Sequence, residues 1–155
     1  MLEIQSSPNA KDLKVGIVVS RWNELITESL LRGAKNAFAK WGGDEAAITV
    51  VRVPGSLEIP SAVSWMAESK RFDGIIALGA VIRGETSHYD HVAGESIKGV
   101  QAVALRTGVP VSTGILTTNT VEEALNRAGI KAGNKGAEAL ETCLEMANLK
   151  KSFEL

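Results

Sequence analysis

The stretch GIIALGAVI, residues 74 to 82, consists only of apolar residues and glycine. A short run of this kind, without alternating polar positions, indicates a strand that is buried on both faces. Three more runs rich in β-branched residues have the same character: KVGIVVS (14 to 20), AITVVRV (47 to 53) and VPVSTGIL (109 to 116). Strands buried on both faces are typical of parallel sheets, so we predict a four-stranded parallel sheet.

Amphipathic helical patterns lie between these runs. Apolar residues recur at helical spacing in residues 30–41 and 89–103, and glycine follows each pattern. Pro60 can open another helix, Thr120 can cap a short one, and a last helix is expected from about Asn134. Parallel strands need crossover connections, and crossover helices cover the faces of the sheet. We therefore predict an α/β fold, a three-layer α/β/α sandwich in a flavodoxin-like arrangement.

The length and charge of the chain limit its organisation and its partners. We expect a polar N-terminal arm over residues 1–13 and a single domain over residues 14–155. Seventeen basic and eighteen acidic residues, with no block of like charge, give no electrostatic reason to expect a nucleic acid or a membrane as partner. No apolar run approaches the ~18 residues of a spanning helix. The single cysteine, Cys143, cannot form an internal disulfide, and we expect a cytoplasmic protein. From the charge balance we expect its partner to be a small molecule or another protein.

The predicted topology selects the segments that carry the chemistry. In an open α/β sheet, ligands bind beyond the carboxyl ends of the strands. The segments that follow the four strands are SRWNELIT (20 to 27), PGSLEIP (54 to 60), RGETSHYDH (83 to 91) and TTNT (117 to 120). The side chains expected at this common edge are Trp22, Ser56, Glu58, Glu85, Thr86 and His88.

The first two segments each allow two interpretations. Trp22 directly follows a strand, so its indole can stack on a heteroaromatic ring, or it can be an ordinary core residue. Ser56 and Glu58 can offer a hydroxyl and a carboxylate to a polyol chain. A serine that caps a helix, followed by a glutamate in its first turn, explains this pair equally well.

The third segment resembles an anion site. Gly84, Glu85 and Thr86 lead into a helix whose free N–H groups and positive dipole end can hold a phosphate. His88 then lies in the first turn, where the dipole disfavours the imidazolium and leaves a neutral base that can move protons. Polar residues also gather at helix starts for capping alone, so a solvated helix start is the alternative.

Metal and nucleotide sites are less well supported. His88 and His91 are three residues apart, with Asp90 or Glu85 as a third metal ligand, but the spacing is common and neither a cysteine nor another histidine supports it. No G-x-G-x-x-G occurs, and GIKAGNKG (129 to 136) lacks the spacing of a P-loop. We expect no metal.

The segments SRWNELIT, VPGSLEIP, LGAVIRGETSHYDHV, TTNTVEEALNRAGIKAGNKG and EMANL, in this order, resemble the lumazine synthase family from about residue 14 to the C-terminus. The resemblance implies a transferase of riboflavin biosynthesis. It would condense 5-amino-6-(D-ribitylamino)uracil with 3,4-dihydroxy-2-butanone 4-phosphate to 6,7-dimethyl-8-ribityllumazine, releasing phosphate and water. No metal or organic cofactor is implied.

The resemblance also implies roles for individual residues. Trp22 matches the residue that stacks on the pyrimidine, and His88 the residue that transfers protons. The ribityl chain is implied to contact Ser56, Leu57 and Glu58, and the pyrimidine edge to contact the backbone of Ala80, Val81 and Ile82. The phosphate is implied to contact Glu85 and Thr86, together with Arg127 of a neighbouring subunit and Lys135 close to it.

Two features bear on substrate affinity and assembly. Many members have phenylalanine where this chain has Thr113, which changes the apolar wall of the site. The short GIKAGNKG connection resembles that of members whose pentamers form icosahedral shells, so we expect a homo-oligomeric shell of pentamers that can enclose riboflavin synthase. A riboflavin-forming relative acting on two lumazines, and a flavin-binding or structural shell protein, are the alternatives. RGETSH and Arg127, as two halves of a phosphate site, argue against the first of these.

Overall fold

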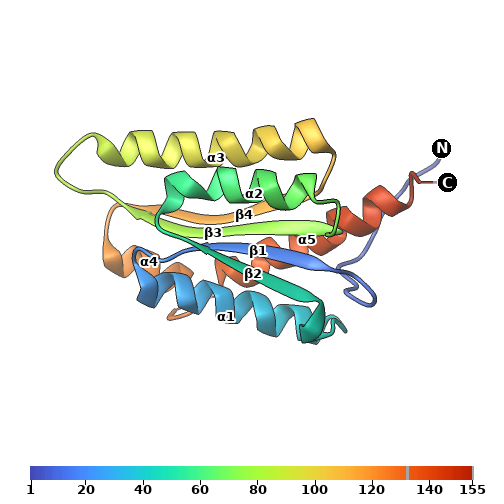
Figure 1. Cartoon of the computed structure of the whole chain (residues 1–155). Coiled ribbons are helices and arrows are strands. Elements are labelled where there is room, and N and C mark those ends of the chain that lie inside the picture. The colour runs from blue at the N-terminus through green and yellow to red at the C-terminus, as the bar shows by residue number, and fades with distance from the viewer. Residues whose placement is uncertain (132, 155) are drawn as a thin grey trace.

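The computed structural model describes residues 1–131 and 133–154; Ala132, in the GIKAGNKG connection, and Leu155 lie outside the described residues. Four parallel strands form one sheet in the order β2-β1-β3-β4, between two layers of helices (Figure 1). The predicted three-layer sandwich is confirmed. The elements are β1 (Val15–Ser20), α1 (Glu24–Lys40), β2 (Ile48–Val53), α2 (Ile59–Glu68), β3 (Gly74–Ile82), α3 (His88–Thr107), β4 (Val111–Thr118), α4 (Val121–Arg127) and α5 (Lys135–Lys151).

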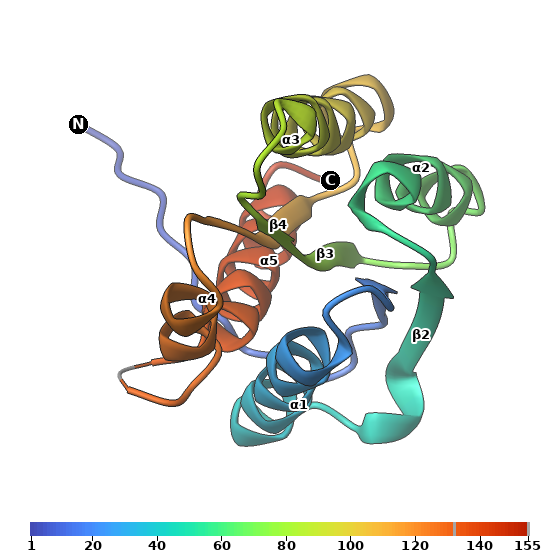
Figure 2. The same ribbon diagram turned by 90° about the vertical axis from the view of Figure 1, so that its left-hand side faces the viewer.

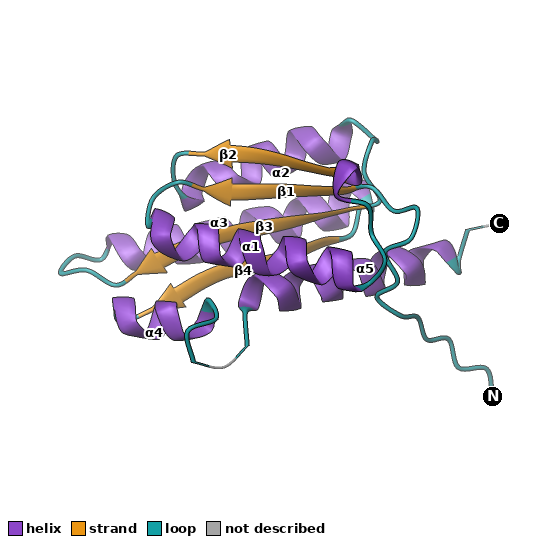
Figure 3. Cartoon of the chain, turned by 90° about the horizontal axis from the view of Figure 1, so that it is seen from below, coloured by secondary structure: helices purple, strands orange, loops and turns teal. Residues whose placement is uncertain are grey.

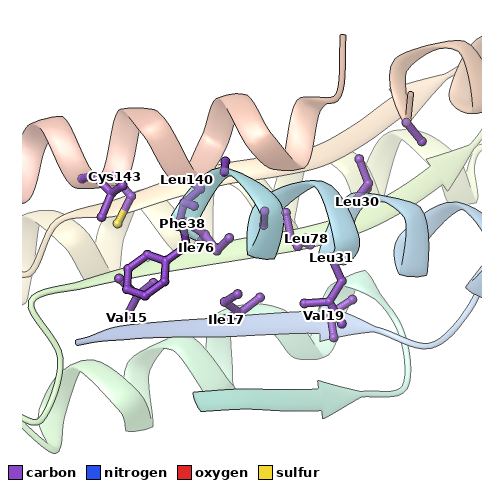
Figure 4. Close-up of a cluster of buried hydrophobic side chains, with 14 of the residues drawn as sticks. Val15, Ile17, Val19, Leu30, Leu31, Phe38, Ile76, Leu78, Leu140 and Cys143 are labelled. Atoms are coloured by element: carbon purple, nitrogen blue, oxygen red, sulfur yellow. The ribbon is translucent and has the colours of Figure 1, made fainter. Parts of the chain in front are cut away.

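The two faces of the sheet bury separate clusters of apolar side chains. Viewed along the sheet, α2 and α3 cover one face, and α1, α4 and α5 lie on the other (Figure 2). Ile17 and Val18 are neighbours on β1 and belong to the two different clusters, as the alternation of side chains along a strand requires. Ile17 packs with Phe38 and Leu140 on the α1 and α5 side (Figure 4). Burial of each such side chain contributes about 1.5–3 kcal/mol.

The prediction that all four strands are buried on both faces is correct only for the central pair. β1 is buried throughout, and β3 is buried except at its last residue. β2 is fully buried only at Val53, and β4 exposes Thr113 and Thr117. The order of the strands explains the difference, because β2 and β4 lie at the edges of the sheet, where the helical layers cover less.

The local helix signals act largely as predicted. α2 carries Pro60 in its first turn, and Thr120 accepts a hydrogen bond from the Glu123 N–H at 3.1 Å. α3 ends at Gly108, whose φ of 73° is in the left-handed region that favours glycine. The side chain of Asn134 caps α5 by accepting from two backbone N–H groups. These caps fix where each helix starts relative to the strand before it.

All four strands point the same way, so their carboxyl ends share one edge (Figure 3). The N-terminal residues instead lie near the opposite end of the sheet, where Asn148 of α5 donates hydrogen bonds to the carbonyls of Ser7 and Asn9. Within the described residues, none of the helices combines the length and apolar character needed to cross a membrane.

Candidate active site

A cavity of about 350 Å³ opens at the carboxyl ends of the strands, and we call it the strand-end cavity. Its walls come from three stretches distant in sequence: the loop after β1, the loop after β2, and the stretch from the end of β3 to the start of α3. Of the residues predicted from the sequence, the lining includes Trp22, Ser56, Leu57, Glu58, Ala80, Val81, Ile82, Thr86 and His88. Glu85, predicted at the phosphate turn, is exposed and is not part of this lining.

Trp22 is a surface residue of the cavity and not a core residue, since it is 64% exposed. Its backbone N–H donates to the Pro54 carbonyl at 3.0 Å, which holds the loop after β1 beside the loop after β2. Its ring lies so close to Gly55 that a Cβ at that position would collide with it. Glycine at position 55 therefore lets the indole lie against the backbone while the ring still lines the cavity.

Asn23, which follows Trp22, is a lining residue that the sequence reasoning missed. Its backbone is left-handed, with φ of 64°, a conformation that asparagine tolerates better than most residues. Its side-chain amide donates to the Ala80 carbonyl at 3.0 Å. The bond ties the loop after β1 to the end of β3. The only signal for it was an asparagine in the segment that follows the first predicted strand.

The capping interpretation holds for Glu58 but is wrong for Ser56, because Gly55 occupies the N-cap position of this turn, while contact of the pair with a polyol chain stays a prediction. Glu58 Oε2 accepts from the Gly55 N–H at 2.9 Å, so the carboxylate caps the turn, and the residue also lines the cavity. Ser56 is buried at the cavity wall. A Cβ on Gly79 would lie 2.7 Å from Ser56 Oγ, so glycine in β3 makes room for the hydroxyl.

The start of α3 presents polar groups to the cavity. Thr86 Oγ1 accepts from the His88 N–H at 3.3 Å, and both residues are exposed. The helix runs for 20 residues from His88, so the positive end of its dipole faces this part of the cavity. His91 is outside the lining, and in the described part of the chain no three His, Cys, Asp or Glu side chains gather as metal ligands would. The turn is suited to an anion.

Three predicted site residues lie elsewhere, in a hollow of about 220 Å³ beside the edge strand β4. This β4-edge hollow contains Thr113, Arg127 and Lys135, and it shares no lining residue with the strand-end cavity. Arg127 donates to the Glu123 carbonyl at 3.2 Å, and Lys135 pairs with Glu138 at 3.2 Å. All three residues are exposed, and so the predicted site is divided into two parts within one chain.

A parallel sheet with an aromatic and polar cavity at its carboxyl edge defines an α/β enzyme that acts on small molecules. The sequence profile described as 6,7-dimethyl-8-ribityllumazine synthase matches residues 12–151. A 6,7-dimethyl-8-ribityllumazine synthase of Deinococcus radiodurans is 50% identical over 154 residues, which is 99% of each chain. The chain belongs to the 6,7-dimethyl-8-ribityllumazine synthase family.

Proposed function

We propose that the strand-end cavity holds the pyrimidine substrate and that the β4-edge hollow of a neighbouring subunit completes its phosphate site. Family membership gives the reaction. The chain is a transferase of riboflavin biosynthesis that forms 6,7-dimethyl-8-ribityllumazine from 5-amino-6-(D-ribitylamino)uracil and 3,4-dihydroxy-2-butanone 4-phosphate.

The pyrimidine ring stacks on Trp22, whose exposed indole lines the cavity against Gly55. Stacking of a base on an aromatic side chain is worth about 1–3 kcal/mol. The ring edge meets the end of β3, and the ribityl chain meets the loop after β2. The residues assigned to these contacts are Ala80, Val81 and Ile82 for the ring edge, and Ser56, Leu57 and Glu58 for the ribityl hydroxyls.

The ketone phosphate lies at the start of α3, where Thr86 and the helix dipole favour an anion. Arg127 of a neighbouring subunit approaches from the opposite side, with Lys135 close by. A charge-assisted contact of this kind contributes about 1.5–3 kcal/mol. Thr113, at the same edge of that subunit, contributes to the wall of the site in place of an apolar aromatic ring.

The chemistry begins when the primary amine of the uracil attacks the ketone and an imine forms with loss of water. Loss of a proton from the neighbouring carbon then expels phosphate and leaves an enol, which tautomerises to a second ketone. The ribitylamino nitrogen attacks this ketone, and the ring closes with loss of a second water. Each of these steps moves a proton, and His88 in the cavity wall is the residue that accepts and returns it. Holding both substrates in contact supplies much of the acceleration.

A split site requires an oligomer. We propose a homopentamer, assembled into an icosahedral shell in the cytoplasm that can enclose riboflavin synthase. The exposure of Arg127, Lys135 and Thr113 on one edge of the chain supports a contact at that edge. Sedimentation of the purified protein distinguishes the two assemblies, because a shell of many pentamers sediments far faster than a free pentamer.

Mixed assemblies test the split site directly. Trp22→Ala weakens binding in the strand-end cavity and Arg127→Ala weakens binding at the β4-edge hollow, so each variant alone is strongly impaired when both substrates are kept near the wild-type KM. When the two are refolded together, random assembly gives roughly one quarter of the sites both intact halves, and lumazine formation recovers to about that fraction of wild type. In the control mixture, Trp22→Ala with Ser56→Ala, both substitutions are in the strand-end cavity, so no cavity is intact and lumazine formation does not recover. Equal recovery in both mixtures, or in neither, would refute the proposal.

A further inference from the structure

We infer that Arg83 is a positioning residue, which holds the first turn of α3 and the turn before it in the arrangement that binds the ketone phosphate. The inference rests on the proposed function of this turn. Residues 83–87 join β3 to α3 as a connection that projects beyond the sheet (Figure 1). In this connection, Gly84, Thr86 and the adjacent His88 line the strand-end cavity.

Arg83 contacts three elements at once. Its backbone N–H donates to the Thr118 carbonyl at 2.8 Å, which extends the pairing of β3 with β4 by one residue. Its Nε donates to Asn119 Oδ1 at 3.0 Å, just beyond the end of β4. Its guanidinium carbon lies 4.4 Å from the centroid of the Tyr89 ring, in the first turn of α3. The backbone of Arg83 thus pairs with β4, and its side chain joins the residue just beyond β4 to the start of the helix.

The geometry requires an arginine. A guanidinium is planar, so one face can stack on Tyr89 while an N–H in its plane reaches Asn119. A lysine ammonium has no planar face to stack on the ring, so it reproduces the two contacts less well. The third partner, Asp90, is 3.6 Å away and mostly exposed, so solvent screens that ion pair and it adds little.

These contacts fix both ends of the phosphate-binding turn. Residue 83 is held to β4, and Tyr89 is held to residue 83, so the five residues between them close a short loop. Among the contacts inside that loop is the bond from the His88 N–H to Thr86. Without the Arg83 side chain, the turn can move relative to Trp22 and Ser56, and an error of about 1 Å in placement is enough to cost substantial activity.

Arg106 provides a matched control at the other end of the same helix. It donates to Ser64 Oγ at 2.9 Å and pairs with Glu68 at 3.2 Å, so it fastens the last part of α3 to α2. Like Arg83 it is partly exposed and joins α3 to a neighbouring element, but it does not line the strand-end cavity. Loss of Arg106 therefore reports on general loosening of α3.

The test measures steady-state kinetics with each substrate varied, together with the melting temperature, for Arg83→Ala, Arg83→Lys, Arg106→Ala and Thr86→Ala. We expect Arg83→Ala to raise the KM for the ketone phosphate by roughly tenfold and to change the KM for the pyrimidine by less than about twofold. Arg83→Lys should restore little, because it lacks the planar fork. Arg106→Ala should leave both KM values at the wild-type level.

One outcome separates the two proposals: Arg83→Ala gives the same KM values as Arg106→Ala, while Thr86→Ala still raises the KM for the ketone phosphate. This outcome would overturn the role of Arg83 and leave the proposed phosphate site intact. If neither Arg83→Ala nor Thr86→Ala changes that KM, the phosphate site itself is wrong and the inference is overturned with it. Full rescue by lysine would also overturn it, because charge alone would then suffice.

Discussion

The strand-end cavity and the β4-edge hollow differ in how they are built. The cavity is shaped by backbone: glycines at positions 55 and 79 leave room for Trp22 and Ser56, and its walls include the end of β3 and the loops after β1 and β2. The hollow is lined by the long, exposed, cationic side chains of Arg127 and Lys135. Arg127 bonds to the Glu123 carbonyl, and Lys135 pairs with Glu138. The strand-end cavity therefore depends on the backbone, and the β4-edge hollow depends on exposed side chains beside an edge strand.

The charges of the two regions complement each other. The lining of the strand-end cavity, all of it within the described residues, includes the carboxylate of Glu58 but neither lysine nor arginine. A helix N-terminus supplies only about half a unit charge, which is little against a phosphate that carries nearly two. The missing cations are in the β4-edge hollow. Under the proposed function, in which a neighbouring subunit supplies these cations, assembly is a condition for phosphate binding.

Arg127→Ala should give the largest effect. Loss of a charge-assisted contact to phosphate should raise the KM for the ketone phosphate by about a hundredfold, with the KM for the pyrimidine nearly unchanged. Steady-state kinetics on the assembled protein measure both values. Arg127→Lys is the control and should recover part of the loss, because it keeps the charge and loses the bidentate geometry. An unchanged KM for the ketone phosphate would mean that the hollow takes no part in the site.

Trp22→Ala should give the next largest effect and act on the other substrate. Removal of about 2 kcal/mol of stacking raises the KM for the pyrimidine by about thirtyfold, while the KM for the ketone phosphate stays near wild type. Trp22→Phe keeps an aromatic face and should stay within about threefold of wild type. Quenching of tryptophan fluorescence by the bound pyrimidine, compared between wild type and Trp22→Phe, measures the same contact without turnover. Similar changes in both KM values would contradict the separation of the two regions.

The sequence predicted the fold well because its signals are local. Apolar runs, a proline at a helix start and the Thr120 cap each act over a few residues, and each forms the element expected of it. The burial of β2 and β4 was predicted wrongly, since an apolar run is alike in a central and an edge strand. Strand order depends on the path of the crossovers, which no single run contains.

The candidate site was predictable in part. The rule that ligands bind at strand ends was enough to bring Trp22, Ser56 and His88 together, because chain direction fixes which ends meet. Arg127 required the family resemblance, since nothing in its neighbourhood distinguishes it from a surface charge. Arg83 and its stacking on Tyr89 were missed, because that contact depends on the route of the loop between them. Tyr89 alone fits an ordinary amphipathic pattern.

His88→Ala should have a smaller effect than either binding variant. Removal of a general base typically costs ~10²–10⁴ in rate, but the substrates can condense slowly unaided, so we expect kcat to fall by about tenfold. Both KM values should stay near wild type, because the stacking and phosphate contacts remain. His91→Ala, one turn along the exposed start of α3, is the control and should retain wild-type kcat. A complete loss of turnover in His88→Ala would show that proton transfer, and not positioning, limits the reaction.

Cys143 lies in neither region, and its substitution should have the smallest effect on catalysis. The thiol is buried beneath α5 against Gly74, and this burial raises the pKa of Cys143 to about 12. The folded pKa is above the unfolded value of about 8.5, so the thiol's contribution to stability is complete below pH ~8.5 and is lost as the pH rises toward 12. Because Cys143 lies outside both regions, Cys143→Ala should leave both KM values unchanged.

Between pH 7 and pH 10 the wild type should lose about 2 kcal/mol more unfolding free energy than Cys143→Ala, at about 1.4 kcal/mol for each pH unit above the unfolded pKa. Urea unfolding at a fixed protein concentration measures this difference, and equal losses in the two proteins would mean that the thiol is not shielded as the structure has it.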